Sequence, residues 1–254
     1  TKKRLKKQLR DSLFIELTTT PKYGLVDLMG KGIHGNMDFK LFERSIDVIC
    51  NDIDILFDLG VTTLKIREKV TLKSIRKKGK IIEDKMFKIT KGVNTLKGGI
   101  FIYSLIFFSI GFTITHNENI KPNFIFDYIK DITNKITDEL SNENLKSFSR
   151  LCYEKYNVTG IRGEVENGLS SVQKTLSIDL KYQSINELSL RRFLYLFKNC
   201  DDTQVIKKIG LKLYRKIQKK IDPFNCNLNE ELEKYRLYVE KYHFSAGGVA
   251  DLLS

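Results

Sequence analysis

The sequence contains no tryptophan, only 3 prolines and only 4 cysteines among its 254 residues. Because proline is scarce and no segment is rich in glycine and serine, no linker is indicated, and we expect one domain spanning residues 1–254. The cysteines lack a C-x-x-C pair, which argues against structural zinc and predicts buried, reduced thiols. They are Cys50, Cys152, Cys200 and Cys226. The charged start lacks the apolar core of a secretory signal, so a cytoplasmic protein is expected.

The period-two alternation of β-strands is also missing. Apolar residues instead recur at helical spacing along most of the chain. Two such stripes are Phe42, Ile46, Ile49, Ile53 and Leu56, and Val205, Ile209, Leu213 and Ile217. The sequence therefore predicts an all-α fold, a single-domain helical bundle or orthogonal array around a central apolar helix.

One apolar run, residues 98–115, is about long enough to cross a membrane. It contains serine, tyrosine and internal glycine, and no second run resembles it. A helix that is apolar on all sides also occurs at the centre of a large helical domain. We therefore expect residues 100–114 to form the buried central helix, and no membrane partner.

The formal net charge is +13. Lysine-rich helix surfaces account for such a charge, and so does an anionic partner such as nucleic acid or a polyphosphate metabolite. The basic runs at residues 2–10 and 73–80 resemble helix surface or loop. An arginine-rich stripe with interleaved aromatic residues is missing, which argues against a nucleic-acid partner.

Three glycine-containing segments set flexible backbone beside a cation or a carboxylate: residues 92–99, 160–164 and 245–253. Glycine lets the backbone approach a ligand closely, and successive N–H groups can hold phosphate. Helix N-termini favour anions in the same way. Three such segments predict a substrate that carries several phosphates.

The segment before the first of these glycine loops holds Lys22, His34 and Asp38 around residues 20–38. These side chains can converge within one loop. The alternative is a loop in which the aspartates and the histidine cap helices.

In residues 83–99, Glu83 precedes Asn94, Thr95 and Lys97, and Lys97 stands at the start of the predicted central helix. Lysine at this place is a point charge for phosphate. The alternative is a capping segment with a lysine that extends into solvent. The order of a Walker A loop is missing.

The third segment places Arg162 beside Glu164 and Glu166. Arginine binds phosphate or carboxylate through two parallel hydrogen bonds. Two glutamates two residues apart converge in a loop but point to different faces of a helix. Asp202 opens a further helix, where it acts as an N-cap or as a metal ligand.

Taken together, these residues resemble the triphosphoribosyl-dephospho-CoA synthase family, which serves citrate lyase and malonate decarboxylase. The family's T-P-K-P-G-L-V-D, G-A-H-x-D-M and G-V-N-T-H-K-G are similar to residues 20–27, 32–37 and 92–98. Its G-x-R-G-E-x-x-x-G, D-T-N-V-x-x-R and S-P-G-G-S-A-D-L-L are similar to residues 160–168, 202–208 and 245–253. Six motifs in the same order cover nearly the whole chain.

The chain departs from this pattern at several positions: Tyr23, Leu96, Gln204, Lys208, Ala246 and Val249. Leu96 replaces a histidine, and Lys208 replaces an arginine and lacks its planar fork. An alternative is therefore a diverged pentosyl transferase or nucleotide-binding protein with altered substrates. A basic nucleic-acid-binding helical module, suggested by charge alone, is the alternative from another class.

The resemblance implies transfer of the triphosphoribosyl group of ATP to the ribose 2′-hydroxyl of 3′-dephospho-CoA, with release of adenine and with Mg²⁺ as cofactor. The implied phosphate- and substrate-binding residues are Lys22, His34, Asn94, Thr95, Lys97, Arg162, Lys208, Ser245, Gly247 and Gly248. Asp38, Glu83 and Asp202 are the Mg²⁺ candidates. Glu164 is the preferred general base, with Glu166 and Asp202 as alternatives, and Asp251 orients the glycine turn.

The partners implied by the resemblance are the two substrates, an acyl carrier protein or a holo-transferase of the same pathway, and a second copy of the chain. The choice between the citrate lyase and malonate decarboxylase pathways stays open.

Overall fold

The computed structural model describes residues 1–116, 121–142, 147–180 and 182–254, and these residues form helices with no strand among them. The all-α prediction is confirmed. Contacts divide the chain into two compact units. Unit 1 comprises residues 1–13, 40–136 and 162–170, and unit 2 comprises residues 14–39, 137–161 and 171–254. The prediction of a single domain stays a prediction.

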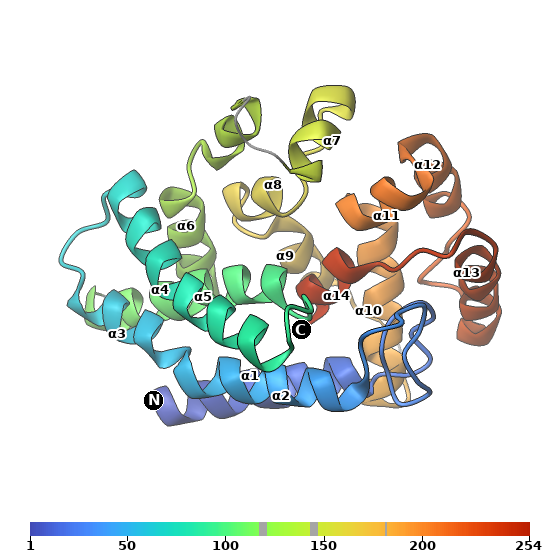
Figure 1. The fold of residues 1–254 in the computed structure, drawn as a ribbon, viewed down its shortest axis with the longest axis horizontal. Helices are drawn as coiled ribbons and strands as arrows, with labels where there is room; N and C mark the ends of the chain where they lie inside the picture. Colours follow the sequence, from blue (N-terminus) through green and yellow to red (C-terminus); the bar gives the residue numbers. More distant parts are fainter. Residues whose placement is uncertain (117–120, 143–146, 181) are drawn as a thin grey trace. The chain divides into compact units, whose positions relative to one another are not determined.

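In chain order, the helices are α1 (Lys2–Thr18), α2 (Phe39–Asp52), α3 (Asp54–Thr62), α4 (Glu68–Ile89), α5 (Lys97–His116), α6 (Pro122–Ile132), the 3₁₀ helix η1 (Ile136–Ser141), α7 (Phe148–Tyr156), α8 (Ile161–Glu166), α9 (Ser170–Ser177), α10 (Ile185–Asn199), α11 (Thr203–Ile209), α12 (Leu211–Gln218), α13 (Leu228–Tyr242) and α14 (Gly247–Leu253). Figure 1 follows them in the same order.

Helix α5 is the core of unit 1, where it packs on α3, α4 and α6 (Figure 1). By length and composition it could cross a membrane, but 67% of its most apolar 18-residue window is buried. An isolated helix of this kind also occurs in soluble cores. The prediction that residues 100–114 form a buried central helix is confirmed.

Two glycines allow α3 and α5 to touch backbone to backbone. A Cβ atom on Gly60 would lie 2.2 Å from the carbonyl oxygen of Phe108, and one on Gly111 would lie 2.2 Å from that of Phe57. These distances are far shorter than van der Waals contact, so only glycine fits at either place. The contact between α3 and α5 therefore depends on shape rather than on polar groups.

Unit 2 has an aromatic core. The ring of Phe197 packs against those of Tyr214, Tyr235 and Phe244, and Tyr235 packs against Phe244, with centroids 5.0–6.1 Å apart. Tyr214 Oη lies 3.2 Å from the carbonyl oxygen of Phe197 and 3.0 Å from that of Cys200, and Gln218 Nε2 donates to the same two oxygens at 2.9 and 2.8 Å. These bonds satisfy carbonyl groups at the end of α10, which have no partner within the helix.

The cysteine prediction is partly wrong. Cys50, Cys152 and Cys200 are buried and free, whereas Cys226 is exposed. Cys226 belongs to the short connection between α12 and α13, where the backbone follows the surface of unit 2. Burial raises the pKa of the Cys50 thiol to about 11, so this thiol is protonated at neutral pH.

Candidate functional site

The residues predicted for the site fall into two groups, one in each unit. Unit 1 holds Glu83, Asn94, Thr95, Lys97, Arg162, Glu164 and Glu166. Unit 2 holds Lys22, His34, Asp38, Asp202, Lys208, Ser245, Gly247, Gly248 and Asp251.

In unit 1, a predicted phosphate cation and a predicted metal ligand are in contact. Lys97 Nζ lies 3.2 Å from Glu83 Oε1, and the exposed Lys80 lies 2.7 Å from the same oxygen. Lys97 is the first residue of α5, where the helix dipole adds partial positive charge. An anion at this helix end would meet the half-exposed ammonium group of Lys97, and Glu83 supplies a hard oxygen beside it.

The side chains of Asn94 and Thr95, just before α5, form hydrogen bonds within the protein. Asn94 Oδ1 accepts from the backbone N–H of Lys97 at 3.1 Å, and Thr95 Oγ1 donates to Ser45 Oγ at 2.8 Å. The capping alternative is therefore confirmed for Asn94. Leu96, which replaces the family's histidine, is buried in the core of unit 1.

The segment around Arg162 is a helix, not the loop that its glycines suggested. Gly160, with φ 54°, and Gly168, with φ 65°, flank α8, and Gly163 is buried within the helix. Residues two apart on a helix do not face each other. The expectation that Arg162 and Glu164 lie side by side is therefore wrong, and of the two alternatives for Glu164 and Glu166 the helical one holds, in which they point to different faces.

Glu166 lines a cavity of about 640 Å³ within unit 1, and this cavity is open to solvent because most of its lining residues are exposed. The other lining residues come from the end of α6, the end of α8 and the turn before α4: Ile66, Lys130, Asp131, Asn134 and Asn167. Sequence reasoning missed all five, because they lie outside the glycine motifs and no local pattern connects the three segments.

In unit 2, two motifs that lie 211 residues apart meet. His34 Nε2 lies 3.1 Å from Ser245 Oγ. A Cβ atom on Gly24, in the first motif, would lie 2.6 Å from the carbonyl oxygen of Phe244, next to Ser245. Burial lowers the pKa of His34 below its ordinary value, so the imidazole is neutral at pH 7. The predicted residues His34 and Ser245 are thus brought together.

Lys22 does not fit its predicted role as a phosphate ligand. Its side chain is fully buried and forms an ion pair with Glu16. The carboxylate of Asp27 accepts hydrogen bonds from the Lys22 backbone N–H, Thr20 Oγ1 and the Met29 backbone N–H, all at 2.8–2.9 Å. This motif therefore builds the loop itself, and a buried, paired ammonium group is closed to a phosphate.

Asp202 is a cap for two helices. Its Oδ1 accepts from the N–H groups of Gln204 at 2.8 Å and Val205 at 3.3 Å, at the start of α11. Its Oδ2 accepts from the N–H of Val249 at 3.0 Å, in α14. Burial raises the pKa of Asp202, and hydrogen bonds from the N–H groups of Val249, Gln204, Val205 and Gly248 act in the opposite direction.

The N-cap interpretation of Asp202 is confirmed. The same geometry corrects the role of the terminal glycines: the N–H groups of Gly248 and Val249 hold the chain's own carboxylate instead of a ligand phosphate. With both oxygens of Asp202 engaged, its assignment as a Mg²⁺ ligand does not fit this geometry.

Lys208 and Asp38 are exposed, whereas Asp251 and Gly247 are half-buried in α14. In the part of the chain that the structure describes, no three His, Cys, Asp or Glu side chains are grouped as a metal site. Mg²⁺ that arrives with a nucleotide needs only one or two carboxylates beside the phosphates. Glu83 and Asp38 remain suitable by this criterion.

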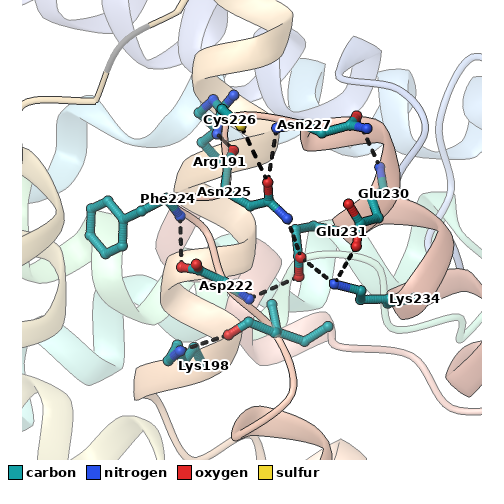
Figure 2. Close-up of polar contacts among 11 residues, drawn as sticks. Arg191, Lys198, Asp222, Phe224, Asn225, Cys226, Asn227, Glu230, Glu231 and Lys234 are labelled. Carbon is teal, nitrogen blue, oxygen red and sulfur yellow. Dashed lines mark hydrogen bonds and ion pairs between the residues drawn. The ribbon is translucent and has the colours of Figure 1, made fainter.

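A further polar cluster joins α10 to the connection between α12 and α13 (Figure 2). The buried Glu231 accepts from Asn225 Nδ2 at 2.8 Å, Lys234 Nζ at 2.7 Å and the Asp222 backbone N–H at 2.9 Å. Burial acts to raise the pKa of Glu231, but these hydrogen bonds outweigh it and the pKa is lowered. Arg191 donates to the carbonyl oxygen of Asn225 at 2.8 Å. The cluster therefore fixes this connection.

Residues 2–254 match the model of the family described as ATP:dephospho-CoA triphosphoribosyl transferase. A probable 2-(5″-triphosphoribosyl)-3′-dephosphocoenzyme-A synthase of Streptococcus mutans is 31% identical over 96% of this chain and 90% of its own length. The corresponding synthase of Escherichia fergusonii is 27% identical over 96% of this chain and 86% of its own length.

The protein CitXG of Haemophilus influenzae is 31% identical over 96% of this chain, which spans only 57% of that relative. No solved structure matches the chain significantly.

Proposed function

Because this chain belongs to the ATP:dephospho-CoA triphosphoribosyl transferase family, as the resemblance predicted, we propose that it transfers the triphosphoribosyl group of ATP to the ribose 2′-hydroxyl of 3′-dephospho-CoA. Adenine is the leaving group. The match of the family model to residues 2–254 is the observation that supports this proposal. The product is the prosthetic-group precursor of a citrate lyase-type enzyme.

The reaction breaks an N-glycosidic bond, so positive charge develops on the ribose in the transition state. A carboxylate that accepts the proton of the 2′-hydroxyl and a cation that holds the triphosphate are the required groups. In unit 1, Lys97 at the N-terminus of α5 suits the triphosphate. Glu164 is the general base in this proposal, and Glu166, which points to another face of α8, serves a different part of the substrate.

Mg²⁺ is part of the proposal as the companion of ATP. Glu83 fits it as a hard oxygen ligand, since its present partners are the lysines Lys80 and Lys97, both more than half exposed. When bound, Mg²⁺ neutralises triphosphate charge. Lys97 orients the same group from the helix end, and Arg162 and Lys208 are further cations for the two substrates.

An adenine-release assay tests the proposal. We expect free adenine only when ATP and 3′-dephospho-CoA are both present. Release from ATP alone, or no release with both, would overturn it. Altered substrates, motivated by Leu96, Gln204 and Lys208, would appear as release with another nucleotide or another acceptor.

Glu164→Gln tests the base. It preserves the shape of the side chain and removes the charge, so we expect kcat to fall about 10²–10⁴-fold while substrate binding persists. The matched control is Glu154→Gln, an exposed glutamate paired with Arg150 on α7. If Glu164→Gln raises KM and leaves kcat unchanged, Glu164 is a binding residue and the base must be sought elsewhere.

We further propose a cytoplasmic enzyme whose product passes to a holo-transferase or acyl carrier protein of the same pathway, and which forms a homodimer. Light scattering after gel filtration tests the dimer: a mass near that of one chain across micromolar concentrations would exclude it.

A further inference from the structure

We propose that the cavity in unit 1, lined by Ile66, Lys130, Asp131, Asn134, Glu166 and Asn167, holds the adenine base of the nucleotide and not its phosphates. The inference rests on the proposed function, in which adenine is the leaving group. It gives that function a base-recognition site formed by residues that no motif contains.

The charge of the cavity disfavours phosphate. Asp131 and Glu166 contribute two carboxylates, and Lys130 contributes the single ammonium group. Asp131 and Lys130 also lie in the last turn of α6, where the helix dipole is negative. A triphosphate would meet net repulsion there, whereas a neutral ring with N–H donors would be attracted.

The chemistry of the lining suits a heteroaromatic base. Carboxylates accept hydrogen bonds, and the amide groups of Asn134 and Asn167 belong to a residue type that both donates and accepts. Adenine has the matching edge: an exocyclic amine that donates and ring nitrogens that accept. Ile66 adds an apolar surface for the ring face. A volume of about 640 Å³ lies within the range of small-molecule sites.

Hydrogen bonds, of which those of Thr133 are buried, fix the backbone on two sides of the cavity. Thr133 Oγ1, which is fully buried, contacts the carbonyl oxygens of Ile129 at 2.7 Å and Val165 at 2.8 Å, and the second bond ties α6 to α8. Asn167 Nδ2 donates to the carbonyl oxygen of Gly163 at 2.8 Å. The backbone around the cavity is therefore held in place, which limits the rearrangement that a base entering it requires of α6 and α8.

Calorimetry with free adenine and hypoxanthine tests the assignment on the whole chain. Hypoxanthine carries an oxygen where adenine carries the amine, so it would face the carboxylates with an acceptor, and we expect it to bind at least tenfold more weakly. Asp131→Asn should weaken adenine binding about tenfold and reduce this discrimination, because the charged acceptor is lost. Glu166→Gln is the second variant.

The matched control is Asp127→Asn, an exposed aspartate one turn earlier on α6 that does not line the cavity, and it should bind adenine like the unmodified chain. Because Asp131 is exposed, its variant should keep the melting temperature of the parent. Product inhibition by adenine measures the adenine affinities of the parent and the variants independently.

Three results would overturn the inference: equal adenine affinity in both variants and the parent, equal affinity for hypoxanthine, or displacement of adenine by inorganic triphosphate or pantetheine. A parent chain that neither binds adenine nor is inhibited by it would do so as well. A chain that binds adenine but releases none from ATP and 3′-dephospho-CoA would instead contradict the proposed function and leave the cavity assignment intact.

Discussion

The motif residues of unit 2 and unit 1 differ in where their charges are placed. In unit 2, Lys22 and Asp202 are buried, and their partners are Glu16 and backbone N–H groups of the same unit. In unit 1, the motif residue Lys97 is half exposed at a helix end, and Asp131, which lies outside the motifs, is exposed at the cavity. A buried, fully paired charge maintains the backbone around it, whereas an accessible charge is available to a ligand. Motif residues of the same type are therefore either structural or available to a ligand. Substitutions distinguish the two, because the first should change stability and the second should change substrate binding.

We expect the largest effect from Lys22→Met. It leaves the carboxylate of Glu16 buried without a partner, which costs about 3–5 kcal/mol of unfolding free energy. The double variant Glu16→Leu/Lys22→Met should recover most of this loss. Urea denaturation measures both, with Lys7→Met, which breaks an exposed pair with Asp11, as the control. If Lys22→Met keeps its stability and only raises the KM for ATP, the scaffold role is wrong.

Asp202→Asn should cost about 2–4 kcal/mol, because an amide cannot accept from both helix ends and a buried N–H in α14 loses its partner. Asp179→Asn, at an exposed position of the same unit, is the control. The measurement is again the urea midpoint. Hydrogen exchange at Val249 should also accelerate in the Asp202 variant; unchanged exchange there would contradict the double cap.

Lys97→Met should raise the KM for ATP about tenfold and leave the melting temperature nearly unchanged, because an exposed ion pair contributes little to stability. Lys80→Met removes the other lysine that contacts Glu83 and serves as the control, with an unchanged KM. Equal KM values in the two variants would show that the end of α5 does not hold phosphate.

The smallest effect concerns pH. The pKa of His34 is lowered by burial from its ordinary value of 6.5, so the unfolded chain binds a proton more readily than the folded one. This contribution to stability is present above pH 6.5 and is lost as the pH falls below it. Denaturation midpoints between pH 7.5 and 5.5 should therefore decline more in the parent than in His34→Gln. If the midpoints of the parent and of His34→Gln decline equally, protonation of His34 does not contribute to the pH dependence of stability.

Local sequence patterns were sufficient to predict part of the fold and one helix cap. The apolar periodicity predicted the helical class and the buried α5, and the sequence Asp201-Asp202-Thr203 predicted the N-cap of α11. The second role of Asp202, as a cap of α14, was not predicted. The hydrogen bond between Val249 and Asp202 joins residues 47 positions apart, so no local pattern indicates it. The contact of His34 with Ser245 is equally long-range, although their motifs suggested a shared purpose.

The glycines of residues 160–168 led to a wrong prediction, a loop where the structure has a helix. Glycine usually indicates a loop, yet here Gly163 is accommodated inside α8 because that side of the helix is buried. The cavity was not predictable at all, since Asp131 and Asn134 sit at the end of an otherwise ordinary amphipathic helix. Tertiary packing determines both the helix at Gly163 and the cavity, and short segments of sequence do not predict tertiary packing.

The glycine contact between α3 and α5 bears on the fate of newly made chains. Until Gly60 reaches Phe108 and Gly111 reaches Phe57, α3 does not cover the apolar surface of α5, and we expect such an uncovered surface to favour aggregation. A single methyl group at Gly60 would slow docking by forcing the two backbones apart. Gly60→Ala should therefore lower the yield of soluble chain more than it lowers the activity of the molecules that fold.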